Sequence, residues 1–298
     1  MSDKLTAVIA EVAQRPEREL RDEAELEANL DLDSLGRIEL LSLIEEELGQ
    51  VVDETRVGPQ TTIGELRRLV AAGSAGGTTI APARWPRSWW ARALRLLLQW
   101  AAFRLQDVWM RIEVVHPERA TRIPLPSILI FNYQGPYVPL LVLRSLPPRL
   151  RLRTAIAADA RLWEGRGRWK GLLIALAGQA FPFAKSGGAV RASLEELARW
   201  LDDGYAVIAS PEGNPEPYGR LLPFLGGTGL MAVEMRVPVV PFKVEGYHRL
   251  FAPHPPFPYL PIGRGRVRLI IGEPVTFPKR MPYDEATDHA RRALIATR

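Results

Sequence analysis

A serine at the start of an acidic helix is the first residue of this chain whose setting indicates chemistry. Ser34 follows Asp33 and precedes Leu35 within residues 30–41. Asp33 is typical of a helix N-cap, which places Ser34 in the first turn with its hydroxyl exposed. A phosphodiester on that hydroxyl would lie at the positive end of the helix dipole. The pattern therefore predicts a serine that can carry a phosphate-linked group.

The helix after Ser34 has an apolar face (Ile38, Leu41, Ile44 and Leu48) and an acidic one. This arrangement resembles the acyl carrier protein family, whose Asp-Ser-Leu motif precedes an acidic recognition helix. The resemblance implies a covalent 4′-phosphopantetheine arm on Ser34, installed by a separate phosphopantetheinyl transferase, with acyl groups carried on its terminal thiol. The residues expected to recognise partners are Asp33, Leu35, Arg37, Glu39 and Glu45. The alternative is a small bundle in which Ser34 is an ordinary first-turn serine.

Three later segments form a second set of motifs: 180–188 with Lys185, 210–214 with Glu212 and Gly213, and 237–241. They resemble motifs of the glycerolipid acyltransferase family, which includes the lysophosphatidate acyltransferases. The resemblance covers about residues 85–280. It implies an α/β domain in which Lys185, Glu212 and Gly213 lie near the acyl or acceptor site. The alternative is that Lys185 is a solvated charge and Glu212 bonds only to backbone at a turn.

The catalytic motif of that family is altered in this chain. The family has Asn-His-x-x-x-x-Asp, in which the aspartate orients the histidine as general base. Here the corresponding positions are Asn132, Tyr133 and Val138. A tyrosine has an ordinary pKa near 10 and is a poor resting base at neutral pH, and valine cannot orient a base. The family mechanism is therefore not expected to operate unchanged.

Other departures concern the acceptor. The family's Thr-Arg after Glu-Gly is Asn214-Pro215, and its lysine after Phe224 is Leu225. In the family these basic groups help to hold the acceptor phosphate, so a phosphate-bearing acceptor is disfavoured. The chain has four histidines, and a surface or packing role is the default for each. His248 is the candidate site residue among them, because it follows a predicted strand end, where α/β folds place ligand-facing groups.

Charge divides the chain into two parts. Residues 1–75 hold 17 acidic and 8 basic residues, a net charge of −9, whereas the other 223 residues hold 17 and 31, a net charge of +14. A basic surface suits anionic lipid, phosphorylated substrates or an acidic partner. Nucleic acid is not expected, because the arginines form no recognised binding motif. The absence of cysteine excludes disulfides and thiolate metal sites, and no metal is predicted.

The elements that position these residues fall into two predicted domains. Helices at residues 5–13, 35–48 and 63–71 form a carrier bundle over residues 1–72, and the Gly/Pro-bearing segment 73–84 is a flexible linker. From residue 85, predicted strands at 112–115, 127–131, 154–157, 206–210, 239–245 and 267–271 alternate with helices at 169–177, 189–202, 228–235 and 283–296. This alternation predicts an α/β domain with a mixed or mainly parallel sheet.

An amphipathic helix over residues 86–110 opens the second domain. Its longest uncharged run, residues 96–103, is too short to span a bilayer. We expect an interfacial helix in which Trp89, Trp90 and Trp100 lie at headgroup depth and Arg92 and Arg95 reach lipid phosphates. The alternative is a helix packed on the domain core. The N-terminus has no secretory signal pattern, so the expected location is cytoplasmic, with peripheral binding to the inner membrane face.

Together these features predict an acyl-handling protein. Ser34 would carry an acyl thioester, which the α/β domain engages with altered or lost His/Asp chemistry. The alternatives are an active O- or N-acyltransferase with a different base, and a non-catalytic module that recruits or shields an acyl chain. The expected partners are acyl-loading and downstream biosynthetic enzymes.

Overall fold

A computed structural model of the chain describes residues 2–32, 34–48, 50–52, 57–58, 60–72, 74–75, 89–163, 168–184, 189–251 and 261–298. Within these ranges, the side chains of Ser34, Leu35, Glu45 and Trp89 are among those outside the description. The chain forms two compact units, divided near residue 81. Each unit is described by itself below.

The N-terminal unit is a helical bundle, as predicted. Its helices are α1 (Ser2–Ala13), η1 (Glu17–Glu19), α2 (Ser34–Leu48) and α3 (Ile63–Ala72), and β1 (Gln50–Val51) pairs antiparallel with β2 (Ser74–Ala75). Apolar residues spaced three or four apart on the helices meet in one core with the loop residues Leu26, Leu30 and Leu32. Among the α2 side chains that the structure describes, Leu40 and Ile44 are wholly buried. Leu40 thus occupies a core position that the predicted apolar face omitted.

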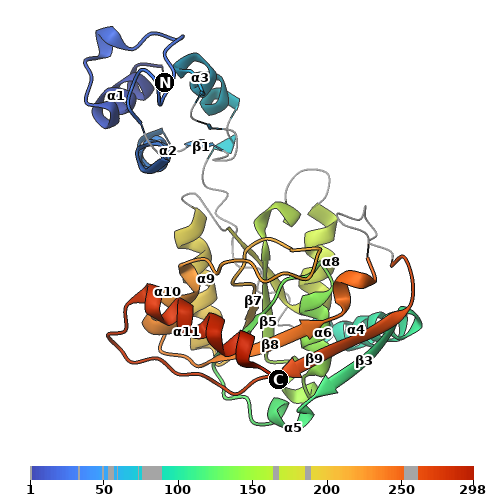
Figure 1. The fold of residues 1–298 in the computed structure, drawn as a ribbon. Helices are drawn as coiled ribbons and strands as arrows, with labels where there is room; N and C mark the ends of the chain where they lie inside the picture. Colours follow the sequence, from blue (N-terminus) through green and yellow to red (C-terminus); the bar gives the residue numbers. More distant parts are fainter. Residues whose placement is uncertain are drawn as a thin grey trace. The chain divides into compact units, whose positions relative to one another are not determined.

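The C-terminal unit is built on a seven-stranded mixed sheet, mostly parallel, in the order β3-β9-β8-β4-β7-β5-β6 (Figure 1). The strands are β3 (Met110–Val115), β4 (Ser127–Phe131), β5 (Thr154–Asp159), β6 (Ala180–Phe183), β7 (Ala206–Ala209), β8 (Val239–Glu245) and β9 (Gly265–Ile271). Only the β8–β9 pair is antiparallel among the strand pairs of this sheet that the structure describes. The predicted mixed, mainly parallel sheet is confirmed.

Alternating side chains bury both faces of this sheet. In β4, Leu129 and Phe131 face one core and Ile128 and Ile130 face the other. Helix α6 (Val138–Ser145) packs in the first core. The second contains residues of α9 (Ala189–Asp202), α10 (Gly227–Glu234) and α11 (Tyr283–Ala296). Helices on both faces are the usual way to cover a mostly parallel sheet.

The remaining described elements are α4 (Trp89–Trp109), α5 (Pro117–Ala120), α7 (Pro148–Arg151), η4 (Ala160–Trp163), α8 (Arg168–Gly178) and η6 (Tyr247–Arg249). Several short elements were absent from the sequence prediction, among them α6 and β6. Helix α6 begins with an apolar run that includes a proline, a pattern that periodicity alone cannot assign. Strand β6 has four residues and pairs only with β5 among the described strands, so it lies at the edge of the sheet.

Candidate active site

The carrier serine lies at the first residue of α2. The preceding loop is held against this end of the helix by Arg37, whose guanidinium donates to Glu27 (2.9 Å) and to the Leu32 carbonyl (3.0 Å). A helix N-terminus with a braced entry loop fits a serine-linked phosphodiester, because free backbone N–H groups and the helix dipole favour negative charge there. The residues that form this end of α2 therefore suit the phosphopantetheine phosphate.

The recognition residues of α2 divide into three groups. Glu39 is exposed, as a partner-facing residue must be. Arg37 was expected to face a partner, but its side chain is only 14% exposed and is paired with Glu27, so that expectation is wrong. Arg37 turns inward because its guanidinium reaches the Leu32 carbonyl, five residues earlier in the chain. Asp33, and the side chains of Leu35 and Glu45, lie outside the described residues.

In the α/β unit, the predicted site residues meet at one edge of the sheet. Strand β4 runs parallel to both β7 and β8, so the carboxyl ends of all three strands lie together. The loop after β4 holds Asn132, Tyr133 and Gln134, the loop after β7 holds Glu212, and His248 follows β8. Ligands of open α/β sheets bind outside the carboxyl ends of the strands. The topology therefore brings together segments more than 100 residues apart.

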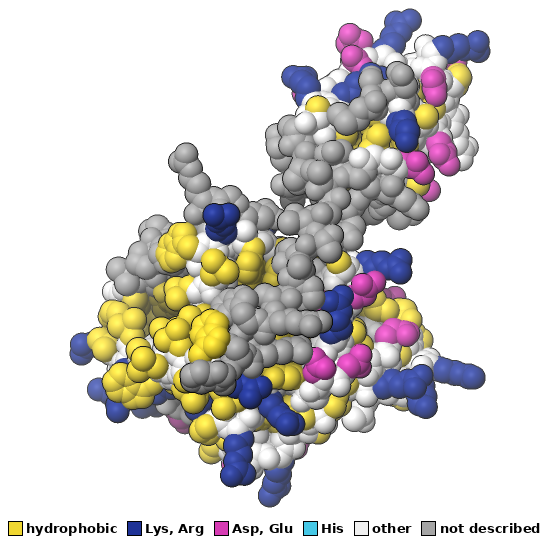
Figure 2. Space-filling view, turned by 180° about the vertical axis from the view of Figure 1, so that it is seen from behind, with side chains coloured by type: hydrophobic (Ala, Val, Ile, Leu, Met, Phe, Trp, Pro, Cys, Tyr) yellow, Lys and Arg dark blue, Asp and Glu magenta, His cyan; other side chains and the backbone are white. Residues whose placement is uncertain are grey.

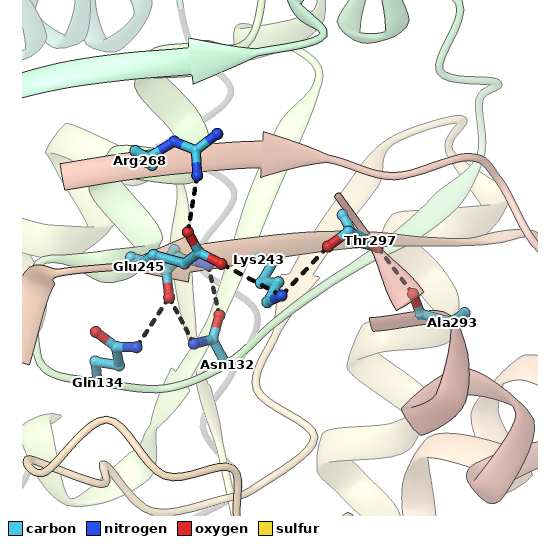
Figure 3. Close-up of polar contacts among 8 residues, drawn as sticks. Asn132, Gln134, Lys243, Glu245, Arg268, Ala293 and Thr297 are labelled. Atoms are coloured by element: carbon cyan, nitrogen blue, oxygen red, sulfur yellow. Dashed lines mark hydrogen bonds and ion pairs between the residues drawn. The ribbon is translucent and has the colours of Figure 1, made fainter. Parts of the chain in front are cut away.

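Asn132 joins the ends of β4 and β8. Its amide donates to the Val244 carbonyl (2.8 Å) and accepts from the Val244 N–H (2.6 Å), as Figure 3 shows. Glu245, next along β8, pairs with Lys243 and Arg268 at 3.3 and 3.2 Å. Asn132 is buried and both its polar ends are used, so it is a structural residue that holds the loop in place.

Tyr133, the predicted counterpart of the family's histidine, lies on a tightly held backbone. Its N–H donates to the Glu212 carboxylate (2.7 Å), and its carbonyl accepts from the Glu216 N–H (2.6 Å). The half-buried ring makes an edge contact with Phe131, with centroids 5.5 Å apart. Two hydrogen bonds therefore join the loop after β4 to the loop after β7, while the Tyr133 side chain remains half-buried.

Val138, the predicted counterpart of the family's aspartate, is wholly buried. It begins α6 and packs into the core beneath the sheet. An apolar side chain in this place leaves no carboxylate at the start of α6.

Glu212 has both carboxylate oxygens occupied by backbone donors. One accepts from Tyr133 and the other from the N–H of Leu222, each at 2.7 Å. Burial raises the pKa of Glu212, and the two backbone hydrogen bonds oppose part of that rise. The geometry supports the turn-bonding alternative for this residue. Gly213 follows it with a positive φ of 70°, a conformation that favours glycine.

Glu216 is a second buried carboxylate, which the sequence analysis missed. Burial acts to raise its pKa, but hydrogen bonds from Arg220 and from the N–H groups of Arg220 and Tyr218 outweigh it and hold the pKa below the usual range. The hydrogen bonds of Glu212 and Glu216 thus fix the conformation of the loop after β7. No spacing rule identifies such a loop carboxylate, since its partners are mostly backbone groups.

Gln134 connects β8 to His248. Its amide nitrogen donates to the Val244 carbonyl (2.8 Å), and its oxygen lies 3.2 Å from the His248 N–H and 3.4 Å from Nδ1. The sequence analysis singled out His248 but not Gln134, because nothing in the local pattern links residues 114 positions apart. Lys185 lies outside the described residues. Within the described ranges, no group of three or more His, Asp or Glu side chains could hold a metal ion.

Helix α4 turns a polar stripe, formed by Arg95, Gln99 and Gln106, toward the protein, whereas Arg92 is exposed. Arg95, which is 0% exposed, donates to the Leu176 carbonyl (2.9 Å), and Gln99 donates to that of Ala177 (2.8 Å). These carbonyls belong to the last turn of α8, where they have no intrahelical donor. The prediction that Arg95 reaches lipid phosphates is therefore wrong. Burial lowers its pKa to about 10.

Comparison with known proteins identifies both units. The family model described as a phosphopantetheine attachment site matches residues 3–70, and the acyltransferase model matches residues 111–245. An acyl carrier protein of Saccharopolyspora erythraea is 31% identical over 67 residues, covering 22% of this chain and 70% of that protein.

Similar acyltransferases match the second unit. The 1-acyl-sn-glycerol-3-phosphate acyltransferase alpha of Mus musculus is 29% identical over 162 residues (54% of this chain, 53% of that protein), and that of Homo sapiens is 31% identical over 127 residues (42% and 43%). The chain thus spans about half the length of these relatives.

The crystal structure of the 1-acyl-sn-glycerophosphate (LPA) acyltransferase PlsC from Thermotoga maritima has the same fold. Its TM-score is 0.50 at 24% identity, and the match covers 68% of this chain and 77% of that one. Through its N-terminal unit the chain belongs to the acyl carrier protein family, with a covalent 4′-phosphopantetheine, and it joins that carrier to an acyltransferase domain homologous to the 1-acyl-sn-glycerol-3-phosphate acyltransferases.

Proposed function

We propose that Ser34 carries an acyl thioester on its phosphopantetheine arm and that the α/β domain takes up this acyl group with altered chemistry at the catalytic motif. The observation that carries the proposal is the pair of replacements at the end of β4. A half-buried phenol and a wholly buried valine lie where the resemblance predicts the histidine and the aspartate. A His–Asp pair is therefore absent from these two positions.

The nearby carboxylate does not replace that pair. Glu212 is only 4% exposed and each of its oxygens already accepts a backbone hydrogen bond, so an acceptor hydroxyl has poor access to this carboxylate. Tyr133 would need a pKa far below 10 to act as a resting base. Acyl transfer by this domain thus requires another group, and without one the domain binds or shields the chain.

The acceptor is proposed to lack a phosphate. Leu225 is 48% exposed where the family has a lysine, and Asn214 closes a turn with its N–H on the Glu212 carbonyl (2.7 Å) where the family has a threonine. Pro215 stands in place of the family's arginine and has no hydrogen-bond donor. A simple hydroxyl or amine compound fits these replacements better than lysophosphatidate.

Intact-protein mass spectrometry tests the proposal. The full chain is converted to its holo form with a phosphopantetheinyl transferase, loaded with an acyl group, and incubated with alcohols, amines or lysophosphatidate. Acyl loss that requires an alcohol or amine, with formation of the acylated product, supports transfer. Loss with lysophosphatidate alone contradicts the proposed acceptor class. Persistence with every acceptor supports the shielding alternative.

The outer face of α4 and α8 supports a second role, peripheral binding to an anionic membrane. Because the polar stripe of α4 faces the protein, its large apolar side chains face outward, among them Leu97 (60% exposed) and Trp100 (59%). Helix α8 adds exposed Trp169, Leu172 and Leu173. Figure 2 views the molecule from behind and shows apolar side chains gathered on one face with Lys and Arg at its margins.

Cations lie beside the exposed tryptophans of this face. The Arg104 guanidinium is 5.9 Å from the Trp100 ring centroid, and the Lys170 ammonium is 6.0 Å from that of Trp169. Tryptophan with an adjacent cation suits the headgroup region of a bilayer. No helix in the described parts of the chain is both long and apolar enough to cross a membrane.

A further inference from the structure

The carboxamide of Gln134 has its orientation determined by its two neighbours. The Val244 carbonyl, 2.8 Å away, can only accept a hydrogen bond, so the NH₂ end of Gln134 must face it. The oxygen end then faces His248, 3.2 Å from its backbone N–H and 3.4 Å from its Nδ1. The backbone N–H can only donate, which independently requires an oxygen at that end.

This orientation selects one tautomer of the His248 imidazole. An amide oxygen only accepts, so Nδ1 is favoured as the protonated nitrogen. The other nitrogen, Nε2, then keeps its lone pair. A carboxylate selects the tautomer of a catalytic histidine in the same way, and here a neutral amide performs that selection because its donor end is already engaged.

The imidazole is also held from its other side. Gly219, in the loop after β7, has φ +79°, and a Cβ added there would lie 2.5 Å from Nδ1 and 2.6 Å from Cε1 of His248. The ring therefore rests against the Gly219 backbone. Gln134, Gly219 and His248 come from the loops after β4, β7 and β8, whose carboxyl ends lie at the same edge of the sheet as Tyr133. The half-buried ring is thus positioned by two separate loops.

We propose that His248, oriented by Gln134, is the general base that replaces the family's His–Asp pair. This inference rests on the proposed function. Nε2 takes the proton from an acceptor hydroxyl or amine as its oxygen or nitrogen forms a bond to the thioester carbonyl carbon. The carbon–sulfur bond then breaks, and the pantetheine sulfur receives the proton from the imidazolium. The products are the acylated acceptor and the free thiol, and the imidazole returns to its neutral form. His248 is the catalytic residue in this step and Gln134 a positioning residue.

The first test does not depend on turnover. In the full chain labelled with ¹⁵N, the nitrogen resonances of the four histidines report which ring nitrogen carries the proton, and His248→Gln assigns the signal. We expect His248 to be protonated at Nδ1, and Gln134→Met to shift it toward a mixture of tautomers. In the Gln134→Met variant the Val244 carbonyl still accepts a hydrogen bond from Asn132. Loss of the Gln134 donor therefore does not leave this carbonyl unpaired. Protonation at Nε2 in the wild type would overturn the assignment.

The second test measures transfer from the acylated carrier. His248→Ala is expected to slow transfer by about 10²–10⁴-fold, the usual contribution of a general base, and added imidazole should restore part of the rate. Gln134→Met should give an intermediate rate. His116→Ala is the matched control, because His116 contacts Glu118 and the Arg298 carbonyl, away from the site.

The outcomes separate the two proposals. Wild-type transfer that persists in His248→Ala overturns the role of His248 and leaves the proposed function standing. A slow His248→Ala variant that imidazole does not rescue contradicts a role in proton transfer. Absence of wild-type transfer with every acceptor contradicts transfer by the domain, and the nitrogen resonances still decide whether the Gln134–His248 pair is formed.

Discussion

The carboxylate of Glu212 accepts a 2.7 Å hydrogen bond from the backbone N–H of Tyr133, the residue predicted to correspond to the family's histidine. The residues are 79 positions apart. Through this bond the loop after β7 holds the loop after β4 in position. The other carboxylate oxygen of Glu212 accepts a hydrogen bond from the Leu222 N–H. Glu212 therefore maintains the shape of the site and is not free to act on an acceptor.

Glu212→Gln is expected to destabilise the protein. A glutamine has one oxygen and one NH₂ group, so either the Tyr133 or the Leu222 N–H must face a donor in a buried position. Leaving a buried donor unpaired costs about 1–3 kcal/mol of unfolding free energy. Thermal or urea denaturation at neutral pH measures the loss. Glu285→Gln, which changes an exposed carboxylate of α11, should change stability by less than about 0.5 kcal/mol. Equal stabilities of the two variants would disprove the bridging role.

Ser34→Ala is expected to abolish phosphopantetheinylation. Incubation of the wild-type chain with coenzyme A and a phosphopantetheinyl transferase should add one arm, visible as a single mass increment. The variant should gain none, since no other serine of the chain lies in such a motif. Labelling that continues in Ser34→Ala would move the attachment to another residue.

Rebuilding the family's His–Asp pair is expected to lower the stability of the protein. Tyr133→His alone should not restore family-type activity, because the imidazole would lack an orienting carboxylate. Val138→Asp places an ionisable group at a wholly buried position, which should lower unfolding free energy by about 3 kcal/mol or more unless the carboxyl is neutral. Val138→Thr, of similar shape with one hydroxyl, should cost less. Denaturation and transfer assays on the same samples separate lost stability from lost chemistry.

Tyr133→Phe separates the phenol from the ring. The variant keeps the edge contact with Phe131 and the backbone hydrogen bonds of residue 133. If Tyr133 is not the base, transfer from the acylated carrier should stay within a few-fold of the wild type (about 1 kcal/mol in activation free energy). A loss of 100-fold or more with unchanged stability would return the phenol to the mechanism.

Two arginines of α4 should behave differently towards membranes. Arg92 is exposed and Arg95 is wholly buried against α8. Arg92→Ala is expected to weaken binding to anionic vesicles at low salt by about 1 kcal/mol. Arg95→Ala should instead lower stability, because the Leu176 carbonyl loses its donor. Vesicle flotation at two salt concentrations measures the first effect, and denaturation the second.

The apolar face of α4 provides a separate test. Replacing Leu97 and Trp100 with Gln removes two of its most exposed apolar side chains, so flotation should fall at every salt concentration, since burial of apolar surface is only weakly salt-dependent. Binding that survives this double change would favour another membrane-facing surface.

The sequence alone determined most strands of the large sheet and the carrier helices of this protein, but not β6. The boundaries predicted for residues 127–131 and 239–245 are those of β4 and β8, because both are short, apolar-rich runs between turn residues. The carrier helix was predicted to within one residue from its N-cap and its apolar spacing. The replacement of the family's histidine and aspartate stays a prediction, which depends only on residue identity at the corresponding motif positions.

Tertiary structure decided which side of each element faces the protein. Helical spacing predicted Arg92, Arg95 and Gln99 on one side of α4, but in the structure Arg92 is exposed whereas Arg95 and Gln99 face the end of α8. The unpaired carbonyls of α8 decided this orientation, because they need donors. In the same way, Gln134 and His248 have no local relationship in the sequence. They meet because β4 and β8 lie side by side and parallel, and only that pairing brings the two loops within hydrogen-bonding distance.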